Sequence, residues 1–282
     1  MVPGMGSEKL HIEKNTVQET LVLPLYGRKV CSERFPQIFH DEEADRLVQS
    51  LDYDFSEYGK SLASSTGLLG ALEVAQRQND VAFEIRDYLA GHERAAVVNM
   101  GCGLDGSFRR CDNGTARGYN VDMPDVIQVR DRLLGEGERE RNIASDLNDF
   151  SWMDQVDGGE GAIFFAMGVL CYFSVQQVRA LLAEIARRFP GSVVVFDAFN
   201  RRGARMFAKT WQKETGIGGV GIGFCLDDPA ELAQWGPEFG HVSSRSYMRG
   251  YQDICPELGL VLRVMVKACD RGMGMRIVKV QL

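Results

Sequence analysis

The sequence lacks the patterns that hold structural metals or disulfide frameworks. Its seven cysteines are odd in number and contain no C-x-x-C pair, which argues against a disulfide framework or a structural zinc site. The same usage favours a reducing, cytoplasmic compartment. The four histidines form no H-x-x-x-H pair, so we expect no metal cofactor.

Long apolar runs are also missing. The longest nearly apolar stretch, 162–173, is shorter than the roughly 20 residues that a membrane-spanning helix needs. The first residues include Glu8, Lys9 and Glu13 and lack the apolar core of a signal peptide. We therefore expect a cytoplasmic protein without membrane attachment.

Basic residues are outnumbered: 32 Lys and Arg against 39 Asp and Glu give a formal net charge of −7. An acidic chain does not have the electrostatic footprint of a nucleic-acid-binding protein. Its length of 282 residues and 45% hydrophobic content are those of an ordinary globular protein with a sizeable core. We expect a small-molecule substrate, and nothing in the sequence specifies an oligomeric state.

Residues 95–108 carry the most informative pattern. Val97 and Val98 begin a short apolar run, as expected of a buried parallel strand, and the run ends in Gly101-Cys102-Gly103 with Asp105 just beyond. Glycines at the end of a strand let backbone approach a ligand closely, because no Cβ stands in the way. In an open α/β sheet, ligands bind outside the carboxyl ends of the strands. The pattern predicts a loop that binds a nucleotide-type cofactor.

The order of elements predicts an α/β fold. Residues 16–89 have helical spacing, with a helix start at 41–48 and apolar helical stretches at 68–75 and 82–89. Strands and helices alternate after that, which predicts a mostly parallel sheet covered on both faces. We expect a helical cap region over 1–90 and one cofactor-binding domain over 91–282. The predicted strands are 95–100, 117–122, 139–143, 161–166, 192–197, 243–249 and 275–281.

Two helix starts and one glycine-rich stretch complete the pattern. Ser174 is a good N-cap for a helix over 175–189, which has a single apolar face. Asp228 followed by proline is a second helix start. Residues 216–223 hold five glycines in eight positions and are either a lid or a simple connection.

The glycine loop also matches the dinucleotide fingerprint G-x-G-x-x-G at Gly101, Gly103 and Gly106. That fingerprint opens a full helix packed on the sheet, but only five residues, 107–111, precede a turn signal here. The ninety residues before the first strand also fit a nicotinamide-dependent domain poorly.

S-adenosylmethionine (SAM) fits the loop better. Its amino-acid portion can lie against glycine backbone, and Asp122, at the end of the second strand, can accept two ribose hydroxyls. Asp146, after the third strand, can accept from the adenine amine. For each carboxylate the alternative is a solvated loop residue or a helix cap.

Several separated stretches together resemble the leucine carboxyl methyltransferase family, over about 20–235. The resemblance is closest to the family's bacterial branch, typified by a polyketide O-methyltransferase. The stretches that carry it are 25–28, 52–55, 97–105, 122–127, 149–152, 168–173 and 227–232.

The resemblance implies a class I SAM-dependent methyltransferase. Its fold is Rossmann-like, with a seven-stranded sheet whose last strand is antiparallel, and it transfers methyl to oxygen, often that of a carboxylate. It implies that Arg77 binds the SAM carboxylate and that Tyr172 and Arg28 position substrate. The residues that it implies at the cofactor are Arg77, Gly101, Cys102, Gly103, Asp105, Asp122, Met123, Asp146, Leu147, Met167 and Gly168.

The chain departs from the family pattern at three places. The aspartate usually found a few residues after the Arg77 position is absent, with Ala82 there. The family usually continues Gly-Leu-Asp-Thr-Arg, but Gly106 and Ser107 follow Asp105, so a basic side chain is missing. The family usually has Ala-Glu-Gly after the fourth strand, but Met167 stands where the glutamate would be. An arginine and a glutamate that once paired can be lost together without leaving a buried unpaired charge.

The sequence therefore predicts a SAM-dependent O-methyltransferase that acts on a carboxylate or hydroxyl of a small, polyketide-like metabolite. A carboxylate acceptor is already ionised at neutral pH and needs no general base, whereas a hydroxyl does. The alternatives are a non-catalytic SAM-binding protein, motivated by the missing loop arginine and the missing glutamate, and, less favoured, a nicotinamide-dependent oxidoreductase.

Overall fold

The protein is described by a computed structural model, which describes residues 9–13, 17–206 and 222–282. Contacts divide the chain into two compact units, Met1–Ala75 and Gln76–Leu282. The helix α4 (Ser65–Gly91) runs from the first unit into the second. The boundary expected from the sequence, between residues 90 and 91, lies at the last residue of this helix.

The first unit is helical, as its spacing predicts. The side chain of Asp41 accepts a hydrogen bond from the backbone N–H of Ala44 and so caps α2, where the sequence predicts a helix start. Tyr26 and Phe55 stack with their ring centroids 4.9 Å apart. The elements of this unit are β1 (Leu10–His11), η1 (Val17–Leu21), α1 (Val22–Arg34), α2 (Glu42–Gln49), β2 (Leu51–Asp52) and α3 (Ser56–Leu62).

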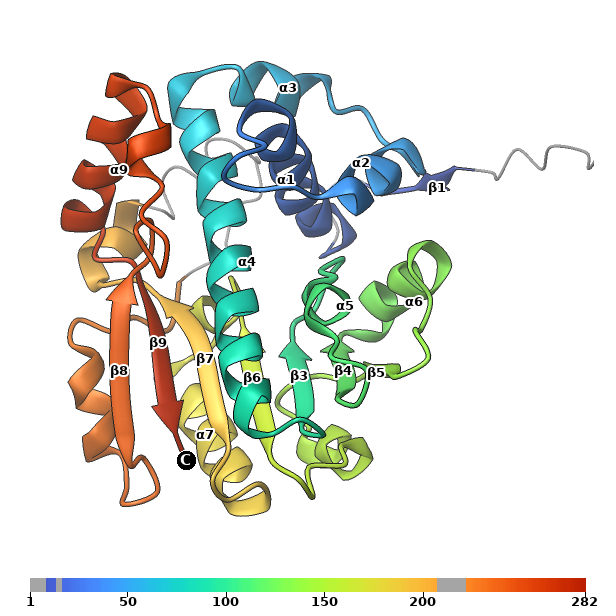
Figure 1. The fold of residues 1–282 in the computed structure, drawn as a ribbon, viewed down its shortest axis with the longest axis vertical. Helices are drawn as coiled ribbons and strands as arrows, with labels where there is room; N and C mark the ends of the chain where they lie inside the picture. The colour runs from blue at the N-terminus through green and yellow to red at the C-terminus, as the bar shows by residue number, and fades with distance from the viewer. Residues whose placement is uncertain (1–8, 14–16, 207–221) are drawn as a thin grey trace, which may run out of the picture. The chain divides into compact units, whose positions relative to one another are not determined.

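The second unit is built on a seven-stranded sheet with the order β5-β4-β3-β6-β7-β9-β8 (Figure 1). Neighbours from β5 to β7 are parallel, and β9, the last strand in the chain, is antiparallel to both β7 and β8. The predicted sheet and its antiparallel last strand are confirmed. The strands are β3 (Ala96–Met100), β4 (Arg117–Asp122), β5 (Glu140–Ala144), β6 (Ala162–Ala166), β7 (Val193–Ala198), β8 (His241–Ser246) and β9 (Arg276–Gln281).

Helices cover both faces of this sheet, because the central strands are apolar on both sides. Every residue of β3, β6 and β7 is buried. In Figure 1 the part of α4 beyond Gln76 crosses the near face, and α7 (Val175–Arg188) lies on the far face. The capping box of Ser174 and Gln177 fixes the start of α7 where the sequence predicts it.

The shorter elements differ more from the prediction. The predicted apolar stretches 68–75 and 82–89 are parts of one continuous helix, α4. Asp228 caps η4 (Pro229–Gln234), which is a 3₁₀ helix. The helix α9 (Leu260–Gly272) was not predicted, and its apolar Leu260 is 76% exposed. The remaining elements are α5 (Ser107–Cys111), α6 (Pro124–Leu133), η2 (Phe150–Gln155), η3 (Leu170–Tyr172) and η5 (Cys255–Glu257).

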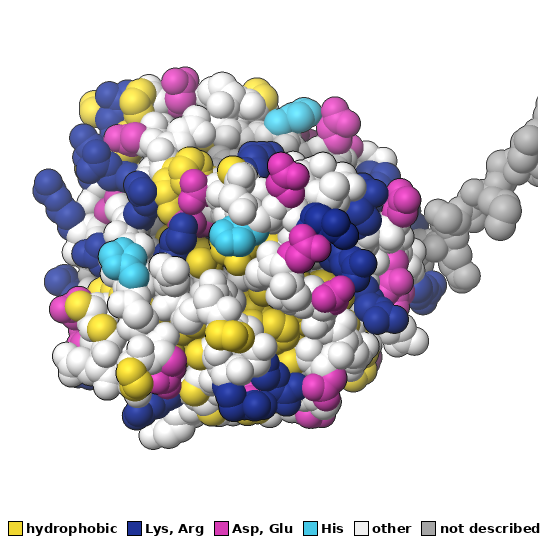
Figure 2. Space-filling view, turned by 60° about the horizontal axis from the view of Figure 1, so that its bottom comes forward, with side chains coloured by type: hydrophobic (Ala, Val, Ile, Leu, Met, Phe, Trp, Pro, Cys, Tyr) yellow, Lys and Arg dark blue, Asp and Glu magenta, His cyan; other side chains and the backbone are white. Residues whose placement is uncertain are grey.

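Acidic and basic side chains are interspersed on the face that Figure 2 shows, which turns the lower end of the view in Figure 1 forward. Two exposed ion pairs lie near the starts of the parallel strands. Arg117 Nη1 lies 2.6 Å from Asp157 Oδ2, and Arg94 Nε lies 3.2 Å from Glu160 Oε1. Such exposed pairs contribute little to stability individually.

Asp80 is a buried acid on the near-face part of α4. Its Oδ1 accepts hydrogen bonds from the backbone N–H of Tyr251, at 3.1 Å, and from Gln76 Nε2, at 3.2 Å. Its Oδ2 is buried and has no hydrogen-bond partner among the described residues. Burial and the nearby Glu84 carboxylate raise the pKa of Asp80 to about 8, although Arg245 opposes this shift. The folded protein therefore keeps a proton on Asp80 at neutral pH.

We expect Asp80→Asn to remove a pH dependence of stability. The folded-state pKa lies above the unfolded value, so the wild type loses stability as pH rises from about 4 to about 8. The variant has no such group, and its free energy of unfolding should gain on the wild type by roughly 1 kcal/mol per pH unit. Urea denaturation at pH 5 and pH 8 measures the difference.

The matched control is Asp87→Asn, because Asp87 lies on the same helix with a side chain that is 58% exposed. A stability difference between Asp80→Asn and wild type that is the same at both pH values would contradict the assignment.

Candidate functional site

The loops that follow the parallel strands meet at one edge of the sheet, because all five strands from β5 to β7 run in the same direction. Gly101 and Gly103 have positive φ angles of 70° and 47°, which glycine adopts readily. A Cβ on Gly101 would lie 2.4 Å from Cγ2 of Val169, in the loop after β6. Glycine at 101 therefore lets the loops after β3 and β6 pack together.

Asp122, at the end of β4, is bonded to the glycine loop. Its Oδ2 accepts a hydrogen bond from the backbone N–H of Gly103, and its Oδ1 accepts one from Met123, both at 2.8 Å. Burial raises the pKa of Asp122, and these two N–H groups act in the opposite direction. The neighbouring Met123 side chain is 42% exposed. The structure thus brings the predicted acid and the predicted loop together.

Asp105, by contrast, uses its carboxylate to hold the loop. Oδ1 accepts hydrogen bonds from Gln78 Nε2, at 2.9 Å, and from both the N–H and the hydroxyl of Ser107. Oδ2 accepts one from Asn99 Nδ2, at 3.1 Å. Arg110 Nη2 lies 3.8 Å from Oδ1. This set of donors favours a structural role for Asp105 rather than contact with a ligand.

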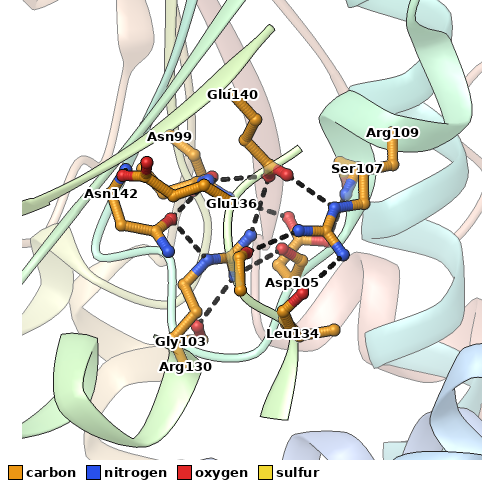
Figure 3. Close-up of polar contacts among 12 residues, drawn as sticks. Asn99, Gly103, Asp105, Ser107, Arg109, Arg130, Leu134, Glu136, Glu140 and Asn142 are labelled. Atoms are coloured by element: carbon orange, nitrogen blue, oxygen red, sulfur yellow. Dashed lines mark hydrogen bonds and ion pairs between the residues drawn. The ribbon is translucent and has the colours of Figure 1, made fainter. Parts of the chain in front are cut away.

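The Arg130 side chain is 0% exposed and contacts the backbone of the glycine loop (Figure 3). Its Nη1 donates to the backbone carbonyls of Gly103, at 3.0 Å, and Asp105, at 2.7 Å. Its Nη2 lies 3.0 Å from Glu140 Oε1, and its Nε donates to Asn142 Oδ1. Arg130 therefore satisfies two carbonyls that the glycine turn leaves without a backbone donor.

Glu140 links this arginine to a second one. Arg109, in α5, donates from Nε to Glu140 Oε2 at 2.5 Å and from Nη2 to the carbonyl of Gly135 at 2.7 Å (Figure 3). Asn120 Nδ2 also donates to Glu140 Oε1. Both oxygens of this carboxylate, whose side chain is 1% exposed, therefore have donors. The sequence analysis missed this network, although Arg130 occupies an apolar-face position of α6.

Arg77 and Gly168 both lie next to Asp197 of β7. Arg77 Nη1 lies 3.8 Å from Oδ2 of Asp197, which lies near the end of β7. Asp197 Oδ1 accepts a hydrogen bond from the backbone N–H of Gly168 at 2.7 Å. Burial alone would lower the pKa of Arg77, but Tyr247 and Asp197 outweigh it and raise that pKa. Asp197 was not predicted from the sequence.

Comparison with known proteins identifies the family. The family model for leucine carboxyl methyltransferase matches residues 25–186, more than half of the chain. The chain belongs to the leucine carboxyl methyltransferase family. A relative, the tetracenomycin polyketide synthesis O-methyltransferase TcmP of Streptomyces glaucescens, is 30% identical over 183 residues, which cover 64% of this chain and 66% of the relative.

The matches to TcmP and to a second curated relative span 66% and 63% of those proteins' lengths, slightly less than two thirds.

Solved structures support the fold. A DUF574 family protein from Streptomyces avermitilis aligns with a TM-score of 0.62 at 11% identity, over 93% of this chain and 96% of its own. A structure from Thermobifida fusca aligns with a TM-score of 0.59 at 16% identity, over 99% and 97%. These confirm the class I methyltransferase fold.

A basic side chain from α5 lies near the carboxylate of the glycine loop. Arg110, three residues after Ser107, approaches Asp105 and donates to Ser107 Oγ at 3.0 Å. It also donates to the Oε1 of Gln78.

The segment after β6 contains Tyr172, which is 43% exposed at the end of η3. Partial burial raises the pKa of its hydroxyl, so Tyr172 is neutral at physiological pH. Met167 is half-buried before Gly168. The expected substrate-facing position of Tyr172 stays a prediction, but an exposed side chain is compatible with it.

The remaining predicted residues divide into exposed and buried ones. Asp146 is exposed after β5, and its Oδ1 accepts hydrogen bonds from the backbone and side chain of Asn148. Leu147 and Cys102 are buried, with 6% and 2% exposure. Burial raises the pKa of the Cys102 thiol, which is therefore not ionised. Leu147 and Cys102 can shape the loop only through backbone and packing.

Arg28 lies in the first unit, where it is buried in α1. Its Nε donates to Asp41 Oδ2 at 2.8 Å, and both side chains are 3% exposed. The same Asp41 caps α2. These contacts favour a structural role for Arg28 over the substrate-positioning role that the resemblance implies.

Three other expectations concern segments or groups that the structure describes only in part. Of the glycine-rich stretch 216–223, residues 216–221 lie outside the described residues. Within the described ranges, no cluster of three or more His, Cys, Asp or Glu side chains could hold a metal ion. None of the described helices has the length and apolarity needed to cross a membrane.

We expect Arg130→Met to destabilise the fold strongly. The substitution leaves two loop carbonyls without donors and removes one of the two cations at Glu140, a loss that costs about 3–5 kcal/mol for a buried pair. Chemical denaturation measures the change. Arg132→Met, at an exposed position of the same helix, is the control and should change stability by less than about 0.5 kcal/mol. Equal effects would contradict a structural role for Arg130.

Proposed function

We propose that this chain is a SAM-dependent O-methyltransferase. The hydrogen bond between Asp122 and Gly103 carries the proposal, since it joins the acid at the end of β4 to the glycine loop after β3. Carboxylates accept ribose hydroxyls readily, and both Asp122 oxygens have a further lone pair beyond the backbone N–H that each accepts. Membership of the leucine carboxyl methyltransferase family supports the same activity.

The residues at the edge of the sheet fit this cofactor. Gly101 and Gly103 admit its amino-acid portion against backbone, and Asp122 would accept its ribose hydroxyls. The exposed Met123 side chain offers an apolar surface for adenine, and Asp146 offers an acceptor for the adenine amine. Arg77 would pair with the SAM carboxylate, since a guanidinium recognises carboxylates well. The rest of the proposed cofactor site would be lined by Cys102, Leu147, Met167 and Gly168. Asp105 would maintain the conformation of the loop.

The residues align the reactants and leave the bond-making step to the cofactor. When bound, SAM supplies a methyl group on a sulfonium, which is already an activated leaving group. Orientation by the site can then provide much of the rate acceleration. A carboxylate acceptor needs no proton removal, whereas a hydroxyl does. The raised pKa of Tyr172 makes it a hydrogen-bond donor to the acceptor rather than a base.

We propose a carboxylate or hydroxyl of a small, polyketide-like metabolite as the acceptor. The support is the sequence similarity to an O-methyltransferase named for tetracenomycin polyketide synthesis. We infer that no metal takes part. The structure-based candidate for substrate positioning is Tyr172, because Arg28 is buried and its Nε donates to Asp41.

Isothermal titration with SAM and S-adenosylhomocysteine tests the cofactor. We expect wild type to bind both, and Asp122→Ala to weaken both by about 10- to 100-fold, because a carboxylate that accepts ligand hydroxyls is lost. Asp154→Ala is the matched control, since its side chain is 71% exposed in an ion pair with Arg188 before β6 begins. Binding of NAD(H) in preference to SAM would overturn the proposal.

Transfer of a radiolabelled methyl group to a panel of carboxylic acids and phenols tests the activity. We expect label in an ester or ether product, and the label should be lost with Asp122→Ala. Tight SAM binding with no transfer to any member of the panel would favour a non-catalytic SAM-binding protein instead.

A further inference from the structure

Asp197 is a buried carboxylate that neither the family resemblance nor the spacing of motifs pointed to. It lies near the end of β7, with 5% of its surface exposed, and its Oδ1 accepts the backbone N–H of Gly168 at 2.7 Å. Among the described parts of the chain, the ion pair found for it is with Arg77. A buried acid in this place needs a physical reason, because burial disfavours its charged form.

Arg77 supplies that reason, and Gly168 makes the approach possible. Gly168 has a φ angle of 73°, and a Cβ placed there would lie 2.6 Å from Arg77 Nη1. Only glycine at 168 therefore lets the guanidinium lie against the backbone. The same glycine donates its N–H to Asp197, so one short segment fixes the carboxylate and leaves space for the cation.

The distance between the two charges matters. Arg77 Nη1 and Asp197 Oδ2 are 3.8 Å apart, which is an ion-pair distance but too long for a hydrogen bond. Asp197 thus neutralises Arg77 without occupying that N–H group. Tyr247, which is 2% exposed, acts together with Asp197 to raise the pKa of the same guanidinium. The guanidinium is held and retains donors for another anion.

Asp197 reaches Arg77 from the strand next to β6, since β6 and β7 are paired in parallel with Ala166 opposite Phe196. Gly168 follows the end of β6, and Asp197 is the last residue but one of β7. The ends of these two strands therefore bring the carboxylate, the glycine and the guanidinium together.

We propose that Asp197 is the positioning residue that holds Arg77 ready for the carboxylate of the cofactor's amino-acid end. This inference rests on the proposed function, because it concerns the same cofactor. Asp197 acts through Arg77 and the loop at Gly168. The aspartate keeps the guanidinium oriented toward the edge of the sheet, and the bound amino acid completes its hydrogen bonds.

A pair of ligands separates this role from a general structural one. S-adenosylhomocysteine carries the amino-acid end, and 5′-methylthioadenosine has the same adenosine portion without it. Asp197→Asn nearly preserves shape and can still accept the Gly168 N–H through its amide oxygen, but it removes the charge that orients Arg77. We expect it to weaken S-adenosylhomocysteine binding about tenfold and to leave methylthioadenosine within about twofold.

The second part of the test is a double-mutant cycle. Arg77→Gln should cause the same selective loss, and adding Asp197→Asn to it should cause no further loss, because the aspartate acts only through the arginine. Asp197→Glu retains the charge and should preserve the ratio of the two affinities. Circular dichroism and thermal melting first check that each variant folds. If Asp197→Asn does not fold, Asp197→Glu is the variant that tests the proposal.

Three results would overturn the proposal. They are an equal loss for both ligands in Asp197→Asn, an unchanged or tighter affinity for S-adenosylhomocysteine, and additive losses in the double variant. A wild type that binds neither S-adenosylhomocysteine nor SAM would instead overturn the proposed function, and the inference with it. The two failures are therefore distinguished by the wild-type titration alone.

Discussion

The buried guanidinium of Arg130 is the interaction on which the site depends. A strand that ends in a glycine turn leaves carbonyls pointing inward, and Arg130 donates to two of them at Gly103 and Asp105. Its charge is balanced by Glu140, which is shared with Arg109. Without such a network, backbone this close to the sheet would leave unsatisfied polar groups, which are costly when buried. Arg130 and its partners therefore fix the conformation of the loop before any ligand binds.

A second constraint is the close packing of the loops themselves. Gly101 approaches Val169 and Gly168 approaches Arg77, each at a distance that a Cβ would block. Asp122 then joins the end of β4 to the loop after β3. Rigid strands thus place backbone donors, a carboxylate and a guanidinium at one edge, and such preorganisation is what a methyl transfer by alignment requires.

The sheet could be predicted from the sequence because its strands are short apolar runs bounded by turn residues, and most predicted bounds lie within two residues of the observed ones. The predicted strand at 243–249 is the least accurate, since β8 is His241–Ser246 and half of its residues are exposed. The glycine loop and Asp122 could be predicted from the sequence because they directly follow predicted strands. The roles of Arg130, Glu140 and Asp197 could not be predicted, because the partner of each buried charge is distant in the sequence. Asp105 shows the converse, since its motif position did not reveal that its oxygens are already used.

A crystal structure of the complex with S-adenosylhomocysteine would decide whether the loop held by Arg130 is the cofactor site. We expect the ribose hydroxyls on the Asp122 carboxylate, the amino-acid end against Gly101 and Gly103, and its carboxylate at Arg77. If the ligand binds elsewhere, the loop is not the cofactor site. If it binds at this edge with its amino-acid end directed away from Arg77, the role assigned to Arg77 is wrong.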